Sequence, residues 1–138
     1  MAKTNTAVFA QTPRTGVAAC TAAVTSPETT APTNIVQVAA AGADGAILTR
    51  LTAMPRATVT ATSLLLYLSK DAGVTKYLID SEVMPAQTVD AVTPIAETVF
   101  TNYDEDEPFR LEAGDRLYVG TRVALASGIV FRAEWTDF

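Results

Sequence analysis

In the C-terminal stretch, residues 111–138, hydrophobic and polar side chains alternate with a period of two. This period is typical of β-strands, in which successive side chains point to opposite faces of a sheet. The positions that share the apolar face are Leu117, Val119, Thr121, Val123 and Leu125 in the first half, and Ile129, Phe131, Ala133 and Trp135 in the second. The pattern predicts two strands, each with one face against a core.

We expect these two strands to form a hairpin, whose register depends on the length of its loop. A two-residue turn would place Val123 opposite Arg132, which sets an apolar face against a charged one. A three-residue loop, 126–128, with Gly128 at positive φ places Val123 opposite Phe131 instead. We favour this second register because it keeps the apolar side chains on one face. The pairs that it predicts are Leu125 with Ile129, Val123 with Phe131, Val119 with Trp135 and Arg122 with Arg132.

The favoured register gathers three arginines, Arg116, Arg122 and Arg132, on the outer face of the hairpin, near Tyr118 and Glu134. Like charges directly opposite one another destabilise a sheet. The cluster is therefore expected either to extend into solvent or to meet an acidic partner, and we take the three arginines as candidate interface residues.

Upstream of the hairpin, further strand patterns are separated by residues that favour turns, including Gly42–Gly45 and Asp71–Gly73. About eight strands and no amphipathic helix predict an all-β fold, a single-domain, jelly-roll-like β-sandwich. We expect this domain to span residues 15–138. The predicted strands are 15–25, 34–41, 46–54, 57–70, 74–84, 95–101 and the two of the terminal hairpin, into which 109–111 leads.

Residues 1–14 are predicted to form an extended N-terminal arm, which carries the candidate interface residues Phe9 and Arg14. Such an arm is either disordered in isolation or lies along a neighbouring subunit.

The segment Leu64–Leu68 is continuously apolar, which indicates a strand covered on both faces. In a two-layer protein the opposing sheet covers one face, and a loop, the arm or another subunit must cover the other. Leu65 and Tyr67 are therefore further candidate interface residues.

The composition excludes several classes of protein. A chain of 138 residues with 49% hydrophobic content suggests one folded domain. The net charge of −5 argues against binding to nucleic acid, because lysine and arginine supply most of that affinity. No apolar run reaches the length of a membrane span, and the N-terminus makes a poor signal peptide. The single Cys20 fits a reducing compartment, so we expect synthesis and assembly in the cytoplasm.

Candidate chemistry is sparse. The chain contains no histidine, which excludes histidine-based triads and zinc sites and removes the commonest general base. Cys20 lies among alanines and is expected to be a buried thiol. The acidic run Asp104–Glu107 lacks the spacing of a calcium loop, and is interpreted as a solvated loop or a polar contact rather than a cation site. We expect no catalytic residue, no cofactor, no metal and no enzymatic activity.

Aromatic residues offer one alternative. Trp135 and Phe138, together with the four tyrosines, are able in principle to line a sugar-binding surface. Core packing or subunit contact is the favoured interpretation.

Several stretches resemble small head proteins of tailed bacteriophages and their prophages, the capsid decoration or cement proteins. The stretches are Phe9–Arg14, Ala41–Gly45 with Leu48–Thr52, Leu66–Lys70 and Leu111–Val119. The resemblance implies a β-sandwich, often trimeric, bound to the outer surface of the phage head at junctions between major capsid subunits. The implied partners are the major capsid protein and further copies of this chain, and the implied location is the virion. The alternatives left open are a carbohydrate- or receptor-binding module on a head fibre or tail, and another tail or connector component.

Overall fold

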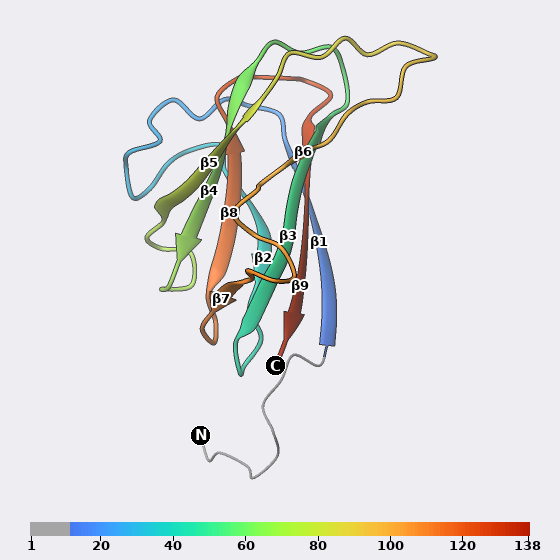
Figure 1. Ribbon diagram of the computed structural model, residues 1–138. Coiled ribbons are helices and arrows are strands. Elements are labelled where there is room, and N and C mark those ends of the chain that lie inside the picture. Colours follow the sequence, from blue (N-terminus) through green and yellow to red (C-terminus); the bar gives the residue numbers. More distant parts are fainter. Residues whose placement is uncertain (1–11) are drawn as a thin grey trace.

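A computed structural model describes residues 12–138 as nine β-strands in two antiparallel sheets (Figure 1). The first sheet has the order β1-β9-β3-β6, and the short β7 also pairs with β3. No helix in this part of the chain is long and apolar enough to cross a membrane. The strands of the first sheet are β1 (Thr12–Cys20), β3 (Ala46–Pro55), β6 (Thr98–Val99), β7 (Phe109–Leu111) and β9 (Ile129–Asp137).

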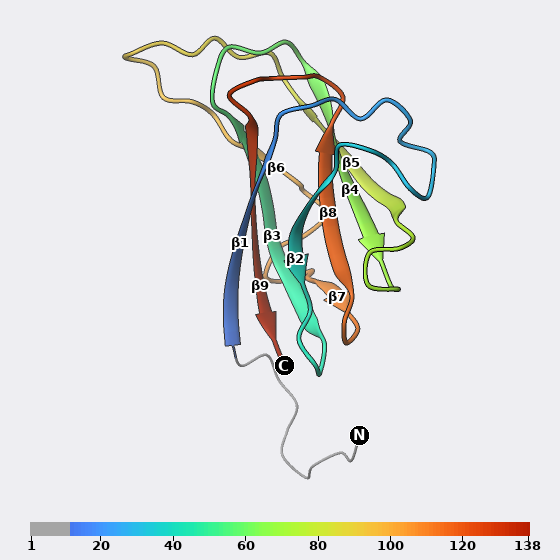
Figure 2. The same ribbon diagram turned by 180° about the vertical axis from the view of Figure 1, so that it is seen from behind.

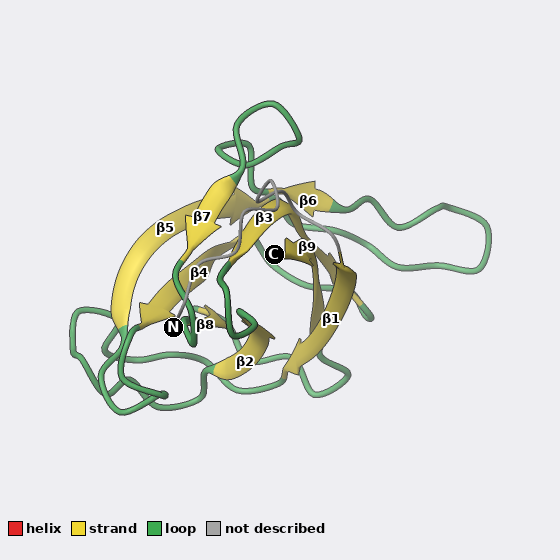
Figure 3. Ribbon diagram, turned by 90° about the horizontal axis from the view of Figure 1, so that it is seen from below, coloured by secondary structure: helices red, strands yellow, loops and turns green. Residues whose placement is uncertain are grey.

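The second sheet has the order β2-β8-β4-β5 and faces the first. Among the strands of residues 12–138, only β4 and β5 are joined by a hairpin within one sheet, through the predicted turn at Asp71–Gly73. Its strands are β2 (Val36–Ala40), β4 (Thr62–Ser69), β5 (Tyr77–Met84) and β8 (Arg116–Thr121). Figure 2 shows the same two layers from behind, and Figure 3 shows them end-on.

This strand order is that of a jelly roll, in which nearly every connection crosses from one sheet to the other. The predicted fold class, an all-β sandwich with jelly-roll character, is confirmed. The ninth strand arises because β6 and β7 both pair with β3, at different points along it.

The core lies between the sheets and is filled by the side chains that alternation assigned to the inner faces. Leu117 and Val119 of β8 face Ile129, Phe131 and Ala133 of β9 across it, and all five are fully buried. Thr121 is also buried, and the predicted inner residues Val123 and Leu125 pack against the core while remaining partly exposed. The predicted inner faces of the C-terminal strands are therefore confirmed.

The predicted terminal hairpin is wrong. β8 pairs with β2 and β4, whereas β9 pairs with β1 and β3, so the two strands belong to opposite sheets. Residues 122–128 cross between the sheets, and Gly128 does adopt positive φ, at 89°. The predicted partners Val123 and Phe131 are not a cross-strand pair. Alternation sets which face of a strand is apolar but not which strand lies beside it.

The boundary of the predicted arm also needs correction. β1 begins at Thr12, so residues 12–14 belong to the first sheet rather than to an arm. Residues 1–11, which include Phe9, lie outside the described part of the chain. The turn at Gly42–Gly45 is present, with the Gly45 N–H donating to the Gly42 carbonyl at 3.2 Å, but it joins β2 to β3 across the two sheets.

Candidate functional site

The predicted arginine cluster does not form, because β8 and β9 lie in different sheets. Arg116 and Arg122 donate hydrogen bonds of 3.1 and 2.8 Å to backbone carbonyls of loops beside the second sheet. Arg132 extends from the outer face of the first sheet, where its Nη2 lies 3.9 Å from a Glu97 carboxylate oxygen. The three candidate interface residues therefore do not form one cluster, since Arg116 and Arg122 lie beside the second sheet and Arg132 on the first.

Leu65 and Tyr67 do face outward from the second sheet, as predicted, but the chain covers them itself. The loop 21–35 crosses this face, and Val24 packs against both side chains to form a small second core. The Tyr67 hydroxyl donates to the Pro27 carbonyl at 3.1 Å. Burial raises the pKa of Tyr67. The prediction that these two residues form an interface is corrected, since the loop fills the place expected of another subunit.

Arg14 serves the fold of the first sheet. Its Nε donates to the Asp137 carboxylate at 3.0 Å, across the β1–β9 pair. The other Asp137 oxygen accepts from the Gly42 N–H at 3.0 Å. This arrangement ties β1, β9 and the turn after β2 together, and it leaves about half of the Arg14 side chain exposed.

Trp135, the centre of the sugar-binding alternative, lies in the core with 8% of its surface exposed. Its ring packs beside Gly16, where an added Cβ would lie 2.8 Å from the indole. It therefore offers no exposed stacking platform, and the core interpretation is confirmed for this residue. Its Nε1 has no hydrogen-bond partner among the described residues.

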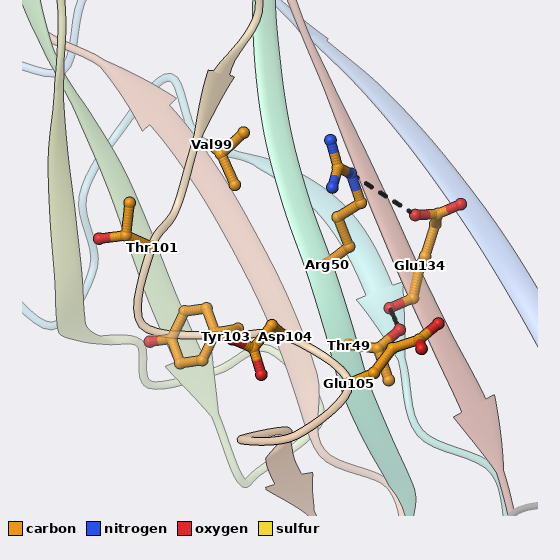
Figure 4. Close-up of a pocket in the computed structure, with 8 residues that line it drawn as sticks. All are labelled: Thr49, Arg50, Val99, Thr101, Tyr103, Asp104, Glu105 and Glu134. Carbon is orange, nitrogen blue, oxygen red and sulfur yellow. Dashed lines mark hydrogen bonds and ion pairs between the residues drawn. The ribbon is translucent and has the colours of Figure 1, made fainter.

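A hollow of about 320 Å³ lies on the outer face of the first sheet (Figure 4). Arg50 stands at its centre, paired with Glu97 and 3.9 Å from Glu134. Tyr103 forms one side, and its pKa is raised by burial and by a hydrogen bond with Asp80. The positive charge is thus already matched by carboxylates, which suits a small polar ligand better than an anion. The lining residues are Thr49, Arg50, Val99, Thr101, Tyr103, Asp104, Glu105 and Glu134.

The acidic loop at Asp104–Glu107 borders this hollow and is organised by its own backbone. One Asp104 carboxylate oxygen accepts from the N–H groups of Asp106 and Glu107, at 2.8 and 2.7 Å. No group of three or more potential metal ligands occurs within residues 12–138. The geometry is that of an exposed turn capped by an aspartate.

Exposed apolar side chains are concentrated in one segment that the sequence analysis did not single out. Among the described residues, nine large hydrophobic side chains are exposed, and six of them lie between residues 74 and 92. Most belong to β5, an edge strand of the second sheet. The six are Val74, Tyr77, Leu78, Ile79, Val83 and Val92.

The edge of β5 is protected against indiscriminate strand pairing. Its register against β4 shifts near Ile79, and its two carboxylates face inward. Asp80 accepts from the Asn102 amide at 3.3 Å, and Glu82 accepts from Thr101 at 3.4 Å. A bulge and inward-pointing charges are devices by which natural proteins limit edge-to-edge association. The apolar side chains of β5 thus remain exposed on a strand whose bulge and carboxylates disfavour indiscriminate pairing at its edge.

After β5 the chain forms a finger, residues 85–97, that extends away from the sandwich (Figures 1 and 2). The Gln87 side-chain amide closes the base of the finger. Its Nε2 donates to the Ala96 backbone carbonyl at 3.0 Å, and its Oε1 accepts from the Ala96 N–H at 3.2 Å. At the tip, one Asp90 oxygen accepts from the N–H groups of Val92 and Thr93, at 2.9 and 2.7 Å. These bonds lower the pKa of Asp90 and present Val92 with 89% of its surface exposed.

A second hollow, of about 480 Å³, lies where β4 begins and where β5 and β8 end. Val83 and Val123 supply its apolar surface, and Arg122 supplies a positive charge. Arg122 makes no ion pair within residues 12–138. The remaining lining residues are Thr60, Ala61, Thr62 and Ser63.

Comparisons with protein-family models, with curated proteins and with solved structures give no match to this chain.

Proposed function

We propose that this chain is a virion structural protein, a capsid decoration or cement protein that binds the outer surface of a phage head where major capsid subunits meet. The observation that carries the proposal is the gathering of exposed apolar side chains on β5 and the finger. Exposed apolar patches of this kind mark contacts with other proteins. In the proposed assembly the chain associates with itself as a homotrimer.

The charge of the chain supports an outer location. A net charge of −5 suits a surface that faces solvent better than one that faces packaged DNA, whose phosphates repel acidic proteins. The stretches that resemble phage head proteins lie in four separate parts of the chain, and two of them, 48–52 and 66–70, fall on the central strands β3 and β4.

A cement protein stabilises a shell by mass action. Because it binds the assembled lattice and not the free subunits, its binding free energy adds to that of the assembled state. A jelly roll suits such a role because its two packed sheets hold the contact residues in fixed positions. The same fold serves many other functions, so the fold alone does not establish this one.

The proposal is tested by deletion and add-back. Phage heads produced without this chain are expected to disrupt at a lower temperature than complete heads, and purified protein added back is expected to co-sediment with them and restore their stability. Failure of the protein to bind the heads, with no change in their stability, would refute the proposed function.

The hollow of Figure 4 favours a second candidate, a carbohydrate- or receptor-binding module of the same virion. Hydroxyl and carboxylate groups beside the Tyr103 ring are the kinds of groups that bind sugars. A glycan array that shows binding by the natural chain and none by Glu105→Ala would support this candidate over the first.

A further inference from the structure

The finger tip and the second hollow complement each other in polarity and charge. Val92 is the most exposed large hydrophobic residue in the described chain, and it is held in place by the Asp90 turn. The hollow offers the apolar surfaces of Val83 and Val123 beside the guanidinium of Arg122, which makes no ion pair within residues 12–138. A tip with a carboxylate next to a valine therefore matches a hollow with a guanidinium next to valines.

One copy cannot bring these two features together. The hollow is bordered by β4, β5 and β8 of the second sheet. In Figure 3 the finger extends past β6 to one side of the molecule, whereas β4 and β5 lie on the other. The tip of one copy thus points away from its own hollow, which stays open.

We propose that the finger of one copy docks into the hollow of a second copy, with Val92 inserted beside Val83 and Val123 and Asp90 paired with Arg122. This inference rests on the self-association contained in the proposed function and specifies its surface. The contact is head-to-tail, because two different surfaces meet, and such contacts close into a ring when the rotation between copies allows it. The ordered turn limits the entropy lost on docking.

The test uses sedimentation velocity of the full chain over a concentration series. Val92→Arg places a positive charge against Arg122 and is expected to weaken self-association about tenfold or more, since it also removes the apolar side chain that docking would bury. Arg122→Glu is expected to weaken it as well. The double variant, V92R with R122E, restores an opposite-charge pair and is expected to recover most of the association.

Two matched controls carry the same substitutions elsewhere. Val74→Arg alters a valine that is 74% exposed but lies in the β4–β5 turn, at the other end of β5. Arg56→Glu alters an exposed arginine that makes no ion pair among the described residues. Both are expected to associate like the natural chain.

Arg122 also holds the loop 21–35 through its hydrogen bond to Val24, so Arg122→Glu could weaken association by disturbing this loop. A cross-linking experiment tests the docking without altering Arg122. Equal amounts of Val92→Cys and Val83→Cys proteins are mixed and oxidised, and a disulfide-linked pair is expected. The control mixes Val92→Cys with Val17→Cys, an exposed valine on β1. Cys20 does not compete, since it is buried.

The outcomes separate the two proposals. If the natural chain associates but Val92→Arg does so equally well, or if Val92→Cys links to Val17→Cys as readily as to Val83→Cys, the docking proposal is wrong and self-association uses another surface. A natural chain that stays monomeric at every concentration refutes self-association itself, while binding to phage heads is still decided by the add-back experiment.

Discussion

The surroundings of Cys20 determine the protonation and the reactivity of its thiol. Its thiol is buried between the sheets and donates to the Val119 carbonyl at 3.5 Å. Burial disfavours the thiolate and raises the pKa of Cys20 from 9.0 to about 12. The residue is thus a packing element with low reactivity, as the sequence predicted.

The first prediction follows from this raised pKa. The group favours the folded state while it is protonated, so its contribution is fully present below its unfolded pKa of 9.0 and is lost as the pH rises toward about 12. The melting temperature of the natural chain is expected to fall more steeply with rising pH across this range than that of Cys20→Ala. Parallel curves for the two proteins would contradict the predicted shift.

Asp115 is a buried carboxylate that connects three segments. It accepts from the Lys70 ammonium at 2.9 and 3.1 Å and from the Glu112 N–H at 2.9 Å. Only 5% of its side chain is exposed, whereas the Glu112 side chain that also pairs with Lys70 is 80% exposed. Buried acceptors of this kind matter more to stability than exposed ion pairs.

We therefore predict different effects for the two acidic residues. Asp115→Ala leaves the Glu112 N–H without its acceptor and is expected to lower the free energy of unfolding by about 1–3 kcal/mol. Glu112→Ala removes only an exposed pair and is expected to change little. Urea denaturation of the two variants measures the difference, and equal effects would show that the burial of Asp115 is unimportant.

At the scale of the elements, the packing of β1 against β2 depends on Gly16, which has no side chain. Gly16 lies where the two sheets approach, and an added Cβ would lie 2.0 Å from the Val38 carbonyl oxygen and 2.8 Å from the Trp135 ring. No rotamer relieves a clash with backbone. The edge of the first sheet therefore closes against β2 only because this residue is glycine.

Gly16→Ala is expected to destabilise the protein by roughly 1–3 kcal/mol, the usual range for overpacking that displaces backbone. The control is Ala19→Val, which enlarges an exposed residue of the same strand. Chemical denaturation compares the two. A Gly16→Ala protein as stable as the control would contradict the close approach of β1 and β2.

The finger belongs to no named strand, and its base is held by a backbone bridge between Val59 and Gln87 and by the Gln87 side chain. Gln87→Ala removes both hydrogen bonds to Ala96 at the base of the finger. We expect faster amide hydrogen exchange within residues 88–96 and an unchanged global free energy of unfolding, because the core lies elsewhere. Unchanged exchange in this segment would show that Gln87 does not hold the finger.

For the whole molecule, the sequence predicted which residues form the core better than it predicted how the strands connect. Leu117 and Phe131 were assigned to inner faces and are buried there. Their strands were wrongly paired, because a hairpin and a crossing between sheets share the same alternation and the same glycine turn. Strand partners in a jelly roll depend on contacts distant in sequence, which periodicity does not contain.

The candidate site was less predictable. The two-sided strand at Leu64–Leu68 correctly indicated a second cover, but the loop 21–35 supplies it in place of another copy. The sequence did not indicate the finger or the second hollow, because a valine that is exposed in the fold looks the same in the sequence as one that is buried. Only the structure shows that Val83 and Val92 are exposed, unlike the valines of the core.

The copy number of this chain in purified virions tests the proposed function most directly. Quantitative mass spectrometry of heads separated from tails, from the phage that carries the gene, measures it. We predict that the chain co-purifies with the heads, at a copy number comparable to that of the major capsid protein. Its absence from virions, or its presence only in the tail fraction, would contradict a role in capsid decoration.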